Sequence, residues 1–240
     1  MKRADLYCTN ERSGGDVPYQ RIKQEYFHRS PDVVLFHDFV IDGETNRLKA
    51  RALPNLKDAL LYDSANAVKD LVDFTLRLGK AAWIADSTDA TTRRITRRVG
   101  EYTGLNVTHP MGENLQMSNY GLGSFFHDHL DYDNAFADNV RWTPEMSDVR
   151  KPSRLATFMI YLTDVKLRGA TVFTRLRITV RPIRNTAVFW YNYDAAAISN
   201  VESQHAGCPV LLGQKWVANK WIRAGGNEFH HQCPLPTSPE

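Results

Sequence analysis

Short apolar runs alternate with polar stretches along this chain, and their character changes near residue 115. Before that point, PDVVLFHDF at residues 31–39 predicts one strand and TLRLGKAAWI at residues 75–84 predicts another. Between them, a polar stretch with spaced apolar positions predicts a helix that begins at Asp42 and ends before Pro54. The N-terminal portion is therefore expected to combine strands with helices.

The clearest helix pattern is TDATTRRITRRVGEYTG, residues 88–104. A Thr or Asp can cap its first turn, Ile95, Val99 and Tyr102 recur at helical spacing, and Gly104 is placed to end it. The arginines of this segment are Arg93, Arg94, Arg97 and Arg98. No aromatic residues are interleaved with them, so we expect a solvated helix face and not a nucleic-acid surface.

From Leu115 onward the chain consists of short runs rich in β-branched and aromatic residues, separated by Gly, Pro and Asn. The candidate strands are ENLQMSNYG, RLATFMIYLTDV, GATVFT, ITVRP, NTAVFWYNY, CPVLLG and KWVANKWIR. Closely spaced strands with turn signals predict a sandwich or barrel of the jelly-roll kind. The expected fold class is α+β, mainly β, with the helices of the N-terminal portion supporting the jelly roll.

Length and composition favour one domain. The chain has 240 residues, of which 42% are hydrophobic, enough for one core. We expect an irregular arm at residues 1–30, a single domain at residues 31–233 with its jelly-roll core at about 115–225, and a tail at residues 234–240. A net charge of +3, from 30 basic and 27 acidic residues, predicts no nucleic-acid partner. No apolar run is long enough to predict a membrane span or a signal peptide.

The segment SFFHDHLDYD, residues 124–133, concentrates side chains that can bind a metal. Side chains alternate along an extended strand, so His127, His129 and Asp131 are expected on one face. The candidate pairs are His127 with His129 and His129 with Asp131. A His-x-Asp pair joined by a distant second histidine forms a facial triad that leaves open positions on Fe(II). Alternation alone does not decide which of the two pairs binds the metal.

A second segment, SQHAGCPVLLGQKWVANKW, adds the missing types of residue. His205 stands ten residues before Lys215 (215 − 205 = 10), with a turn expected at Gly213 and Gln214. A lysine that points into a barrel is costly unless it meets a negative charge. The far carboxylate of 2-oxoglutarate would supply that charge, so Lys215 is a candidate for binding it.

Four stretches in this order, LQMSNYGLGSFFHDHLDYD, RLATFMIYLTDVKLRGATVF, NTAVFWYNYD and HAGCPVLLGQKWVANKWI, closely resemble the catalytic domain of the collagen prolyl 4-hydroxylase alpha subunit. The resemblance runs from about Val33 to Cys233 and covers most of the chain. It implies a double-stranded β-helix enzyme that uses Fe(II), 2-oxoglutarate, O2 and ascorbate. The implied reaction converts proline in collagen-like X-Pro-Gly sequences to 4-hydroxyproline and 2-oxoglutarate to succinate.

The resemblance also implies roles for individual residues. The implied iron ligands are His129, Asp131 and His205, and no catalytic residue is implied beyond them. The implied 2-oxoglutarate contacts are Lys215, Tyr120 and, by likeness to plant-type relatives, Thr157. Tyr120 stands nine residues before the first ligand (129 − 120 = 9), which is the spacing of the family.

The substrate side of the site departs from the family. Trp221 matches a tryptophan near the substrate groove, but Phe126, His127 and Asp128 replace a Tyr-Glu-Pro run that family members usually carry. Phe126 and His127 are therefore candidate substrate residues, and the loss of the tyrosine hydroxyl puts the preferred substrate in question. A related non-collagen prolyl substrate is one alternative, and a non-catalytic jelly roll that binds proline-rich peptides is another.

The resemblance further implies a disulfide between Cys208 and Cys233. It would close a loop of about two dozen residues and stabilise the fold by roughly 3 kcal/mol on a loop-entropy argument. Animal members of the family work in the lumen of the endoplasmic reticulum with protein disulfide isomerase as their beta subunit. We expect the same compartment and partner here, together with a proline-rich or collagen-like peptide as substrate.

Overall fold

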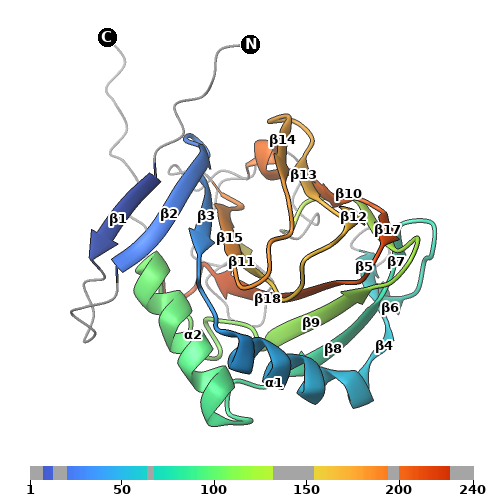
Figure 1. Ribbon diagram of the computed structural model, residues 1–240, viewed down its shortest axis with the longest axis horizontal. Coiled ribbons are helices and arrows are strands. Elements are labelled where there is room, and N and C mark those ends of the chain that lie inside the picture. The colour runs from blue at the N-terminus through green and yellow to red at the C-terminus, as the bar shows by residue number, and fades with distance from the viewer. Residues whose placement is uncertain (1–7, 13–20, 64–67, 132–153, 194–199, 228–240) are drawn as a thin grey trace.

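The computed structural model of this chain describes residues 8–12, 21–63, 68–131, 154–193 and 200–227. Two helices lie outside a strongly curved sheet, and a second, smaller sheet lies on the opposite side of it (Figure 1). The helices are α1 (Asp42–Ala52) and α2 (Ala90–Thr103), with short 3-10 turns at Leu53–Asn55 and Val201–Ser203. In the described residues, no helix has the length and apolar character needed to cross a membrane.

The larger sheet has nine antiparallel strands. Their order is β1 (Cys8–Arg12), β2 (Arg21–His28), β3 (Val33–His37), β15 (Ala187–Tyr191), β11 (Arg154–Tyr161), β18 (Lys215–Arg223), β9 (Leu115–Tyr120), β8 (Lys80–Ile84) and β4 (Lys57–Asp58). Its central strands come from distant parts of the chain, because β18 lies between β11 and β9. This crossing order brings Lys215 opposite Tyr120.

The smaller sheet has five antiparallel strands. Their order is β14 (Ile178–Val180), β13 (Thr171–Phe173), β16 (His205–Gly207), β10 (Phe125–His129) and β7 (Arg77–Leu78). Two further pairs join β12 (Leu167–Arg168) to β17 (Val210–Leu212) and β5 (Leu61–Asp63) to β6 (Val68–Leu71). Two antiparallel sheets of this kind, with few helices, confirm the mainly β, jelly-roll fold class.

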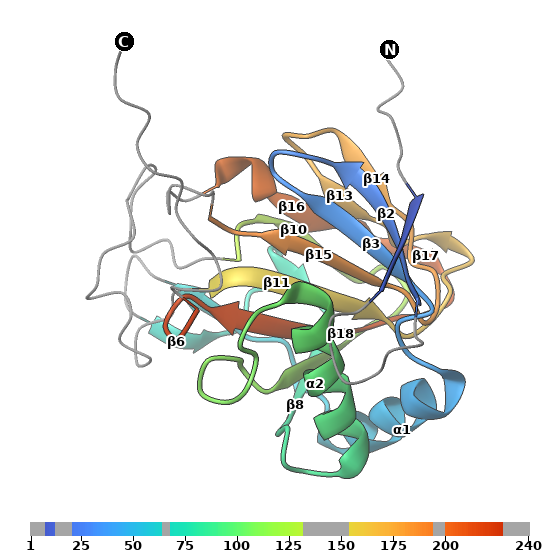
Figure 2. The same ribbon diagram turned by 90° about the vertical axis from the view of Figure 1, so that its left-hand side faces the viewer.

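Alternation along the strands of the large sheet gives the molecule two cores. Phe158 and Ile160 on β11 belong to the core that packs against Ile95 and Val99 of α2. Their neighbour Tyr161 faces the other way, into the core shared with the small sheet. The same strands thus bind the supporting helices on one face and build the interior of the jelly roll on the other (Figure 2).

The N-terminal residues correct one expectation. Residues 1–30 were predicted to be an irregular arm, yet β1 and β2 lie within them and extend the large sheet through β3. The polar composition hid these strands, because backbone hydrogen bonds between β1 and β2 and between β2 and β3 define them. Ile22 and Gln24 are buried at 6% and 7% exposure.

The predicted strand at residues 75–84 is in fact two strands. Arg77 and Leu78 form β7 in the small sheet, whereas Lys80 begins β8 in the large sheet. Gly79 separates them and is buried against the ring of Tyr120. An apolar run does not reveal such a crossing, since both halves remain extended and half-buried.

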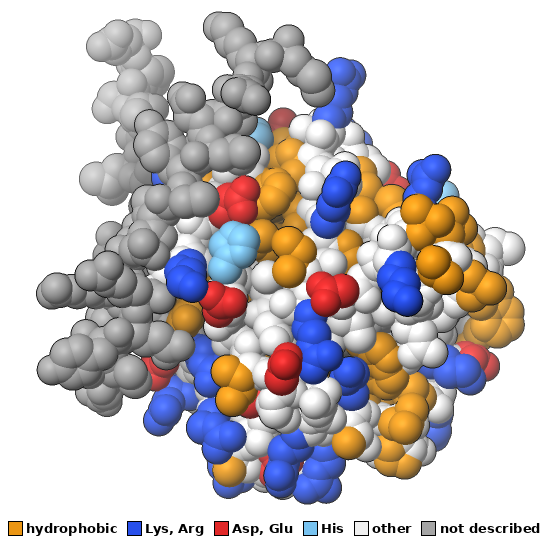
Figure 3. Space-filling view, in the orientation of Figure 1, with side chains coloured by type: hydrophobic (Ala, Val, Ile, Leu, Met, Phe, Trp, Pro, Cys, Tyr) orange, Lys and Arg blue, Asp and Glu red, His pale blue; other side chains and the backbone are white. Residues whose placement is uncertain are grey.

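Helix α2 forms as expected, with one correction on its charged face. The carboxylate of Asp89 accepts hydrogen bonds from Thr91 N and Thr92 N at 2.8 and 3.0 Å, and Gly104 ends the helix at a φ of 71°. Blue side chains gather over the helices at the bottom of Figure 3. Arg98 is not among the solvated ones, because it is 18% exposed and forms an ion pair with buried Glu44 at 2.9 Å.

Candidate functional site

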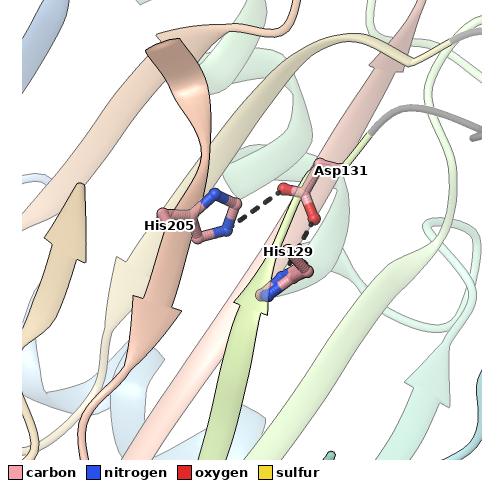
Figure 4. A group of neighbouring side chains, drawn as sticks. All are labelled: His129, Asp131 and His205. Atoms are coloured by element: carbon pink, nitrogen blue, oxygen red, sulfur yellow. Dashed lines mark ion pairs between the residues drawn. The ribbon is translucent and has the colours of Figure 1, made fainter. Parts of the chain in front are cut away.

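Three side chains that can bind a metal meet between β10 and β16. His129 ends β10, Asp131 follows two residues later, and His205 begins β16, where it pairs in register with His129. His129 Nε2 lies 3.6 Å from Asp131 Oδ1, and His205 Nε2 lies 3.8 Å from Asp131 Oδ2 (Figure 4). Ligand atoms of all three lie within 4.8 Å of one another, so one metal ion could bind all three.

Backbone carbonyls fix which ring nitrogen of each histidine faces the centre. His129 Nδ1 lies 2.7 Å from the carbonyl oxygen of His127, and His205 Nδ1 lies 2.9 Å from that of Ser203. A carbonyl only accepts, so Nδ1 carries the proton in both rings and the Nε2 lone pair is free. Burial, with His129 nearby, lowers the pKa of His205 to about 4, which keeps that imidazole neutral near neutral pH.

Asp131 is buried and oriented by two donors. Thr157 Oγ1 and Trp221 Nε1 both donate to its Oδ2, at 2.7 and 3.0 Å. Burial alone would raise the pKa of this carboxyl, but His205 and His129 outweigh it and hold the pKa well below its usual range. Asp131 is therefore ionised, with Oδ1 free of these two donors.

A β-bulge decides which histidine faces the centre. Phe126 pairs with Gly207 and His129 pairs with His205, so three steps along β10 match two steps along β16. The extra residue breaks the alternation and places His129 on the same side as Phe126, with the rings stacked at 3.6 Å. His127 is exposed and does not line the cavity, contrary to the expectation that it shares a face with His129.

The cavity beside the three residues contains a buried lysine. Lys215 is 3% exposed, and its Nζ donates to Thr171 Oγ1 at 3.2 Å. Thr171 Oγ1 also accepts from the hydroxyl of Tyr161 at 2.8 Å. In the described residues no carboxylate forms an ion pair with Lys215, and burial lowers its pKa to about 8. A buried cation whose hydrogen bond is to a neutral hydroxyl is suited to bind an anionic ligand.

The structure places the other two predicted co-substrate residues differently. Tyr120 lines the cavity and pairs with Lys215 across β9 and β18. Thr157 does not line it, because its hydroxyl is bonded to Asp131 and accepts a bond from Asn192 at 3.1 Å. A contact between Thr157 and 2-oxoglutarate stays a prediction, whereas its contact with Asp131 is direct.

Of the predicted substrate residues, Trp221 and Phe126 line the cavity, whereas His127 is exposed and does not. Trp221 is buried, donates to Asp131, and carries the guanidinium of Arg154 over its ring at 3.7 Å. Phe126 lines the cavity. Cys208 also lines it, but Cys233 lies outside the described residues, so the predicted disulfide stays a prediction.

The sequence reasoning missed several polar residues of the cavity, among them Arg77 and Thr171. Arg77 is 5% exposed, and its guanidinium lies 4.5 Å from the Phe126 ring centroid. The arginine inside the apolar run TLRLGKAAWI could have indicated a site residue, because a charged side chain in a buried strand is rarely left without a polar partner. Thr171 gave no comparable signal, since threonine is common in strands.

Comparison with known proteins agrees with this geometry. Residues 115–223, which contain the three candidate ligands and Lys215, match the family described as the 2OG-Fe(II) oxygenase superfamily. Prolyl 4-hydroxylase subunit alpha-3 of Homo sapiens is 37% identical over 236 residues, which are 98% of this chain and 41% of that protein. Prolyl 4-hydroxylase subunit alpha-1 of Caenorhabditis elegans is 34% identical over 233 residues, 97% of this chain and 40% of that protein. The chain thus spans about two fifths of the length of the curated relatives it matches.

Solved structures show the same fold at lower identity. A viral collagen prolyl hydroxylase from Paramecium Bursaria Chlorella virus-1 aligns with a TM-score of 0.59 and 23% identity, covering 80% of this chain and 96% of that one. A Pseudomonas putida prolyl-4-hydroxylase aligns with a TM-score of 0.51 and 14% identity, covering 81% and 94%. The family implies Fe(II), 2-oxoglutarate and O2, and the buried two-histidine, one-carboxylate set fits such a metal. The resemblance seen in the sequence is confirmed: residues 115–223 match a 2OG-Fe(II) oxygenase domain, and the chain is similar to prolyl 4-hydroxylase alpha subunits over nearly all its length.

Proposed function

We propose that this chain is the catalytic region of a peptidyl-proline 4-hydroxylase that acts on collagen-like X-Pro-Gly sequences. The observation that carries the proposal is one cavity with two parts, the cluster of His129, Asp131 and His205 and the buried cation Lys215, which forms no ion pair within the described residues. A hydrolytic zinc site could use the same three ligands but would have no use for that lysine. A dioxygenase needs both parts.

The residues of the cavity would divide the work as follows. His129, Asp131 and His205 would hold Fe(II), where O2 would be the oxidant and 2-oxoglutarate, oxidised to succinate and CO2, would supply the two electrons that balance proline hydroxylation. Lys215 and Tyr120 would bind the distal carboxylate of 2-oxoglutarate. Phe173 and Trp190 pack against His205 at ring-centroid distances of 5.7 and 4.7 Å and would exclude water from that side. The protein's task is to position and to exclude water, and no side chain needs to act as a nucleophile.

The proposed substrate is proline in a collagen-like peptide, with ascorbate as reductant. Support comes from the named relatives, which are prolyl 4-hydroxylase subunits and a viral collagen prolyl hydroxylase. A non-collagen prolyl peptide is the second candidate, since Phe126 lines the cavity where the family has a tyrosine hydroxyl. We also propose, from family resemblance alone, protein disulfide isomerase as beta subunit and the lumen of the endoplasmic reticulum as compartment.

The test is direct oxygen transfer. The protein is incubated with Fe(II), 2-oxoglutarate, ascorbate and either a (Pro-Pro-Gly) repeat peptide or a proline-rich peptide without glycine. Mass spectrometry should find the mass of one added oxygen atom per modified proline in the repeat peptide. Oxygen gain only in the glycine-free peptide would favour the second candidate. No gain in either peptide, from folded protein that binds 2-oxoglutarate, would contradict hydroxylation of prolyl peptides.

A further inference from the structure

The hydroxyl oxygen of Tyr120 is occupied from one side. Arg77 Nη2 donates a hydrogen bond to it at 3.3 Å. A guanidinium can donate but not accept, so the proton of the Tyr120 hydroxyl must point to another atom. Among the described residues, no acceptor lies within hydrogen-bond distance of that proton. The phenol is therefore arranged as a donor toward a group that the protein itself does not provide.

That free donor lies beside the buried cation. Tyr120 on β9 pairs in register with Lys215 on β18, and both side chains line the cavity. Lys215 Nζ lies 5.9 Å from the centroid of the Tyr120 ring. A ligand carboxylate bound by the ammonium group of Lys215 would thus lie near the hydroxyl of Tyr120. One of its oxygens could accept the proton of that hydroxyl.

Arg77 is itself held rigidly. Its Nη2 also reaches Gln116 Oε1 and Ser118 Oγ at 3.3 and 3.2 Å, and its Nη1 reaches the carbonyl oxygen of Leu60 at 3.3 Å. The ring of Phe126 covers the guanidinium. These contacts hold Nη2, which shares its two hydrogens among Gln116, Ser118 and Tyr120, close to the Tyr120 hydroxyl, while Nε is buried with no partner in the described residues.

Gly79 holds the ring of the same tyrosine. A Cβ added at Gly79 would lie 2.9 Å from Cδ1 and 3.0 Å from Cε1 of Tyr120, so any other residue would push the ring aside. Gly79 is also the point at which the chain passes from β7 in the small sheet to β8 in the large sheet. The short segment 77–79 therefore contacts Tyr120 at both its hydroxyl and its ring.

We propose that Arg77 and Gly79 are positioning residues, which hold Tyr120 so that its hydroxyl donates to the distal carboxylate of 2-oxoglutarate. This inference rests on the proposed function, since it assumes that 2-oxoglutarate is the ligand of Lys215. Arg77 acts through Tyr120, so its loss costs affinity only while the tyrosine hydroxyl is present.

Calorimetric titration of 2-oxoglutarate into the Mn(II)-loaded whole chain tests this without turnover. Tyr120→Phe should raise the Kd about tenfold, the cost of one hydrogen bond to a charged group. Arg77→Met should raise it by about five- to tenfold, and the double variant should bind no more weakly than Tyr120→Phe alone. Arg97→Met, at a largely exposed arginine of α2, is the matched control and should leave the Kd unchanged.

A second pair of variants keeps the test decisive if Arg77→Met fails to fold. Gly79→Ala retains every donor of Arg77 but displaces the Tyr120 ring, so it should also raise the Kd several-fold. Gly43→Ala is its matched control, because an added Cβ at Gly43 meets nothing within 4 Å. Thermal melting of each variant separates weakened binding from lost structure.

The outcomes distinguish this inference from the proposed function. Wild-type protein that does not bind 2-oxoglutarate would overturn both. Tight wild-type binding that Tyr120→Phe weakens, but that neither Arg77→Met nor Gly79→Ala changes, would overturn only the positioning role. If the two single effects multiply, the Kd of the double variant would rise about a hundredfold. That result would show that Arg77 acts independently of Tyr120 and would also overturn the positioning role.

Discussion

At the scale of single residues, the buried charge of Lys215 predicts its role in binding 2-oxoglutarate. Its ammonium group is buried beside a threonine hydroxyl, so the free protein carries an unfavourable desolvated charge that a bound carboxylate would relieve. We expect Lys215→Met to raise the KM for 2-oxoglutarate by about ten- to a hundredfold, the usual range for a lost charge-assisted hydrogen bond. Succinate release measures this. Lys166→Met, at an exposed lysine, is the control, and wild-type succinate release by the Lys215 variant would contradict the assignment.

The same lysine predicts a pH dependence. Burial lowers its pKa from 10.5 to about 8, so raising the pH through 8 removes the charge that would bind 2-oxoglutarate. We expect the Kd of the Mn(II)-loaded protein to rise about tenfold between about pH 7 and pH 9, since each unit above a pKa removes tenfold of the cation. Titration at each pH checks this, and Lys215→Met should show no such rise. A flat wild-type profile would contradict the role of the ammonium group.

The two candidate pairs in SFFHDHLDYD make opposite predictions for mutation. Asp131→Ala should abolish proline hydroxylation, because it removes one ligand of the cluster and leaves Thr157 and Trp221 without their acceptor. His127→Ala should retain a measurable fraction of activity, since that side chain is exposed. Oxygen gain by mass spectrometry compares the two. The reverse order of activities would show that the ligand register is wrong by two residues.

The site residues were predictable from the sequence to different degrees. His205, Lys215 and the HDH segment were identified by residue type and spacing, but alternation could not choose between His127 and Asp131. It failed because a β-bulge shifts the face of β10 between Phe126 and His129. Only the resemblance to the family selected Asp131. The role of Trp221 was also incomplete, since spacing gave no sign that its indole bonds to that carboxylate.

At the scale of elements, helix α2 was predicted well because its cap, its apolar stripe and its final glycine are all local signals. Asp89 carries the cap, and we expect Asp89→Ala to lower the free energy of unfolding by about 1–2 kcal/mol. Urea denaturation measures this. Asp73→Ala, at a carboxylate that caps only a local turn, should cost less. Equal losses in the two variants would contradict a special role for the helix cap.

The cap should also fail in acid. Burial alone would raise the pKa of Asp89, but backbone N–H donors and Arg47 outweigh it and lower the pKa from 3.8 to about 2. A depressed folded-state pKa stabilises the native protein above 3.8, and that contribution disappears as the pH falls through about 2. The loss of stability in acid should therefore be shallower in Asp89→Ala than in wild type, as thermal melts across this range would show.

Elements were harder to predict wherever long-range pairing defines them. The break between β7 and β8 and the strands within residues 1–30 both depend on partners distant in the sequence. The hydrophobic pattern indicates whether a segment is buried. It does not indicate which of the two sheets an extended segment joins. Arg98 was placed wrongly for the same reason, because its partner Glu44 lies 54 residues away.

At the scale of the whole molecule, the large sheet supports helices on one face and the ligand cavity on the other. Mn(II) with 2-oxoglutarate should bind only the folded protein, so saturating both should raise the melting temperature by several degrees. Removing the metal with a chelator should reverse the rise. Asp131→Ala should show no rise, and an equal rise in that variant would place the ligands elsewhere.

The bulge in β10 has a consequence for anyone who would move this site into another protein. On a regular hairpin with the same sequence, Phe126 and His129 would point to opposite faces, so His129 would lose either its contact with Phe126 or its pairing with His205. Deleting one residue between Phe126 and His129 would instead restore regular pairing and keep the two rings on one face. The bulge must therefore be transferred together with the segment whenever the sequence from Phe126 to His129 is kept unchanged.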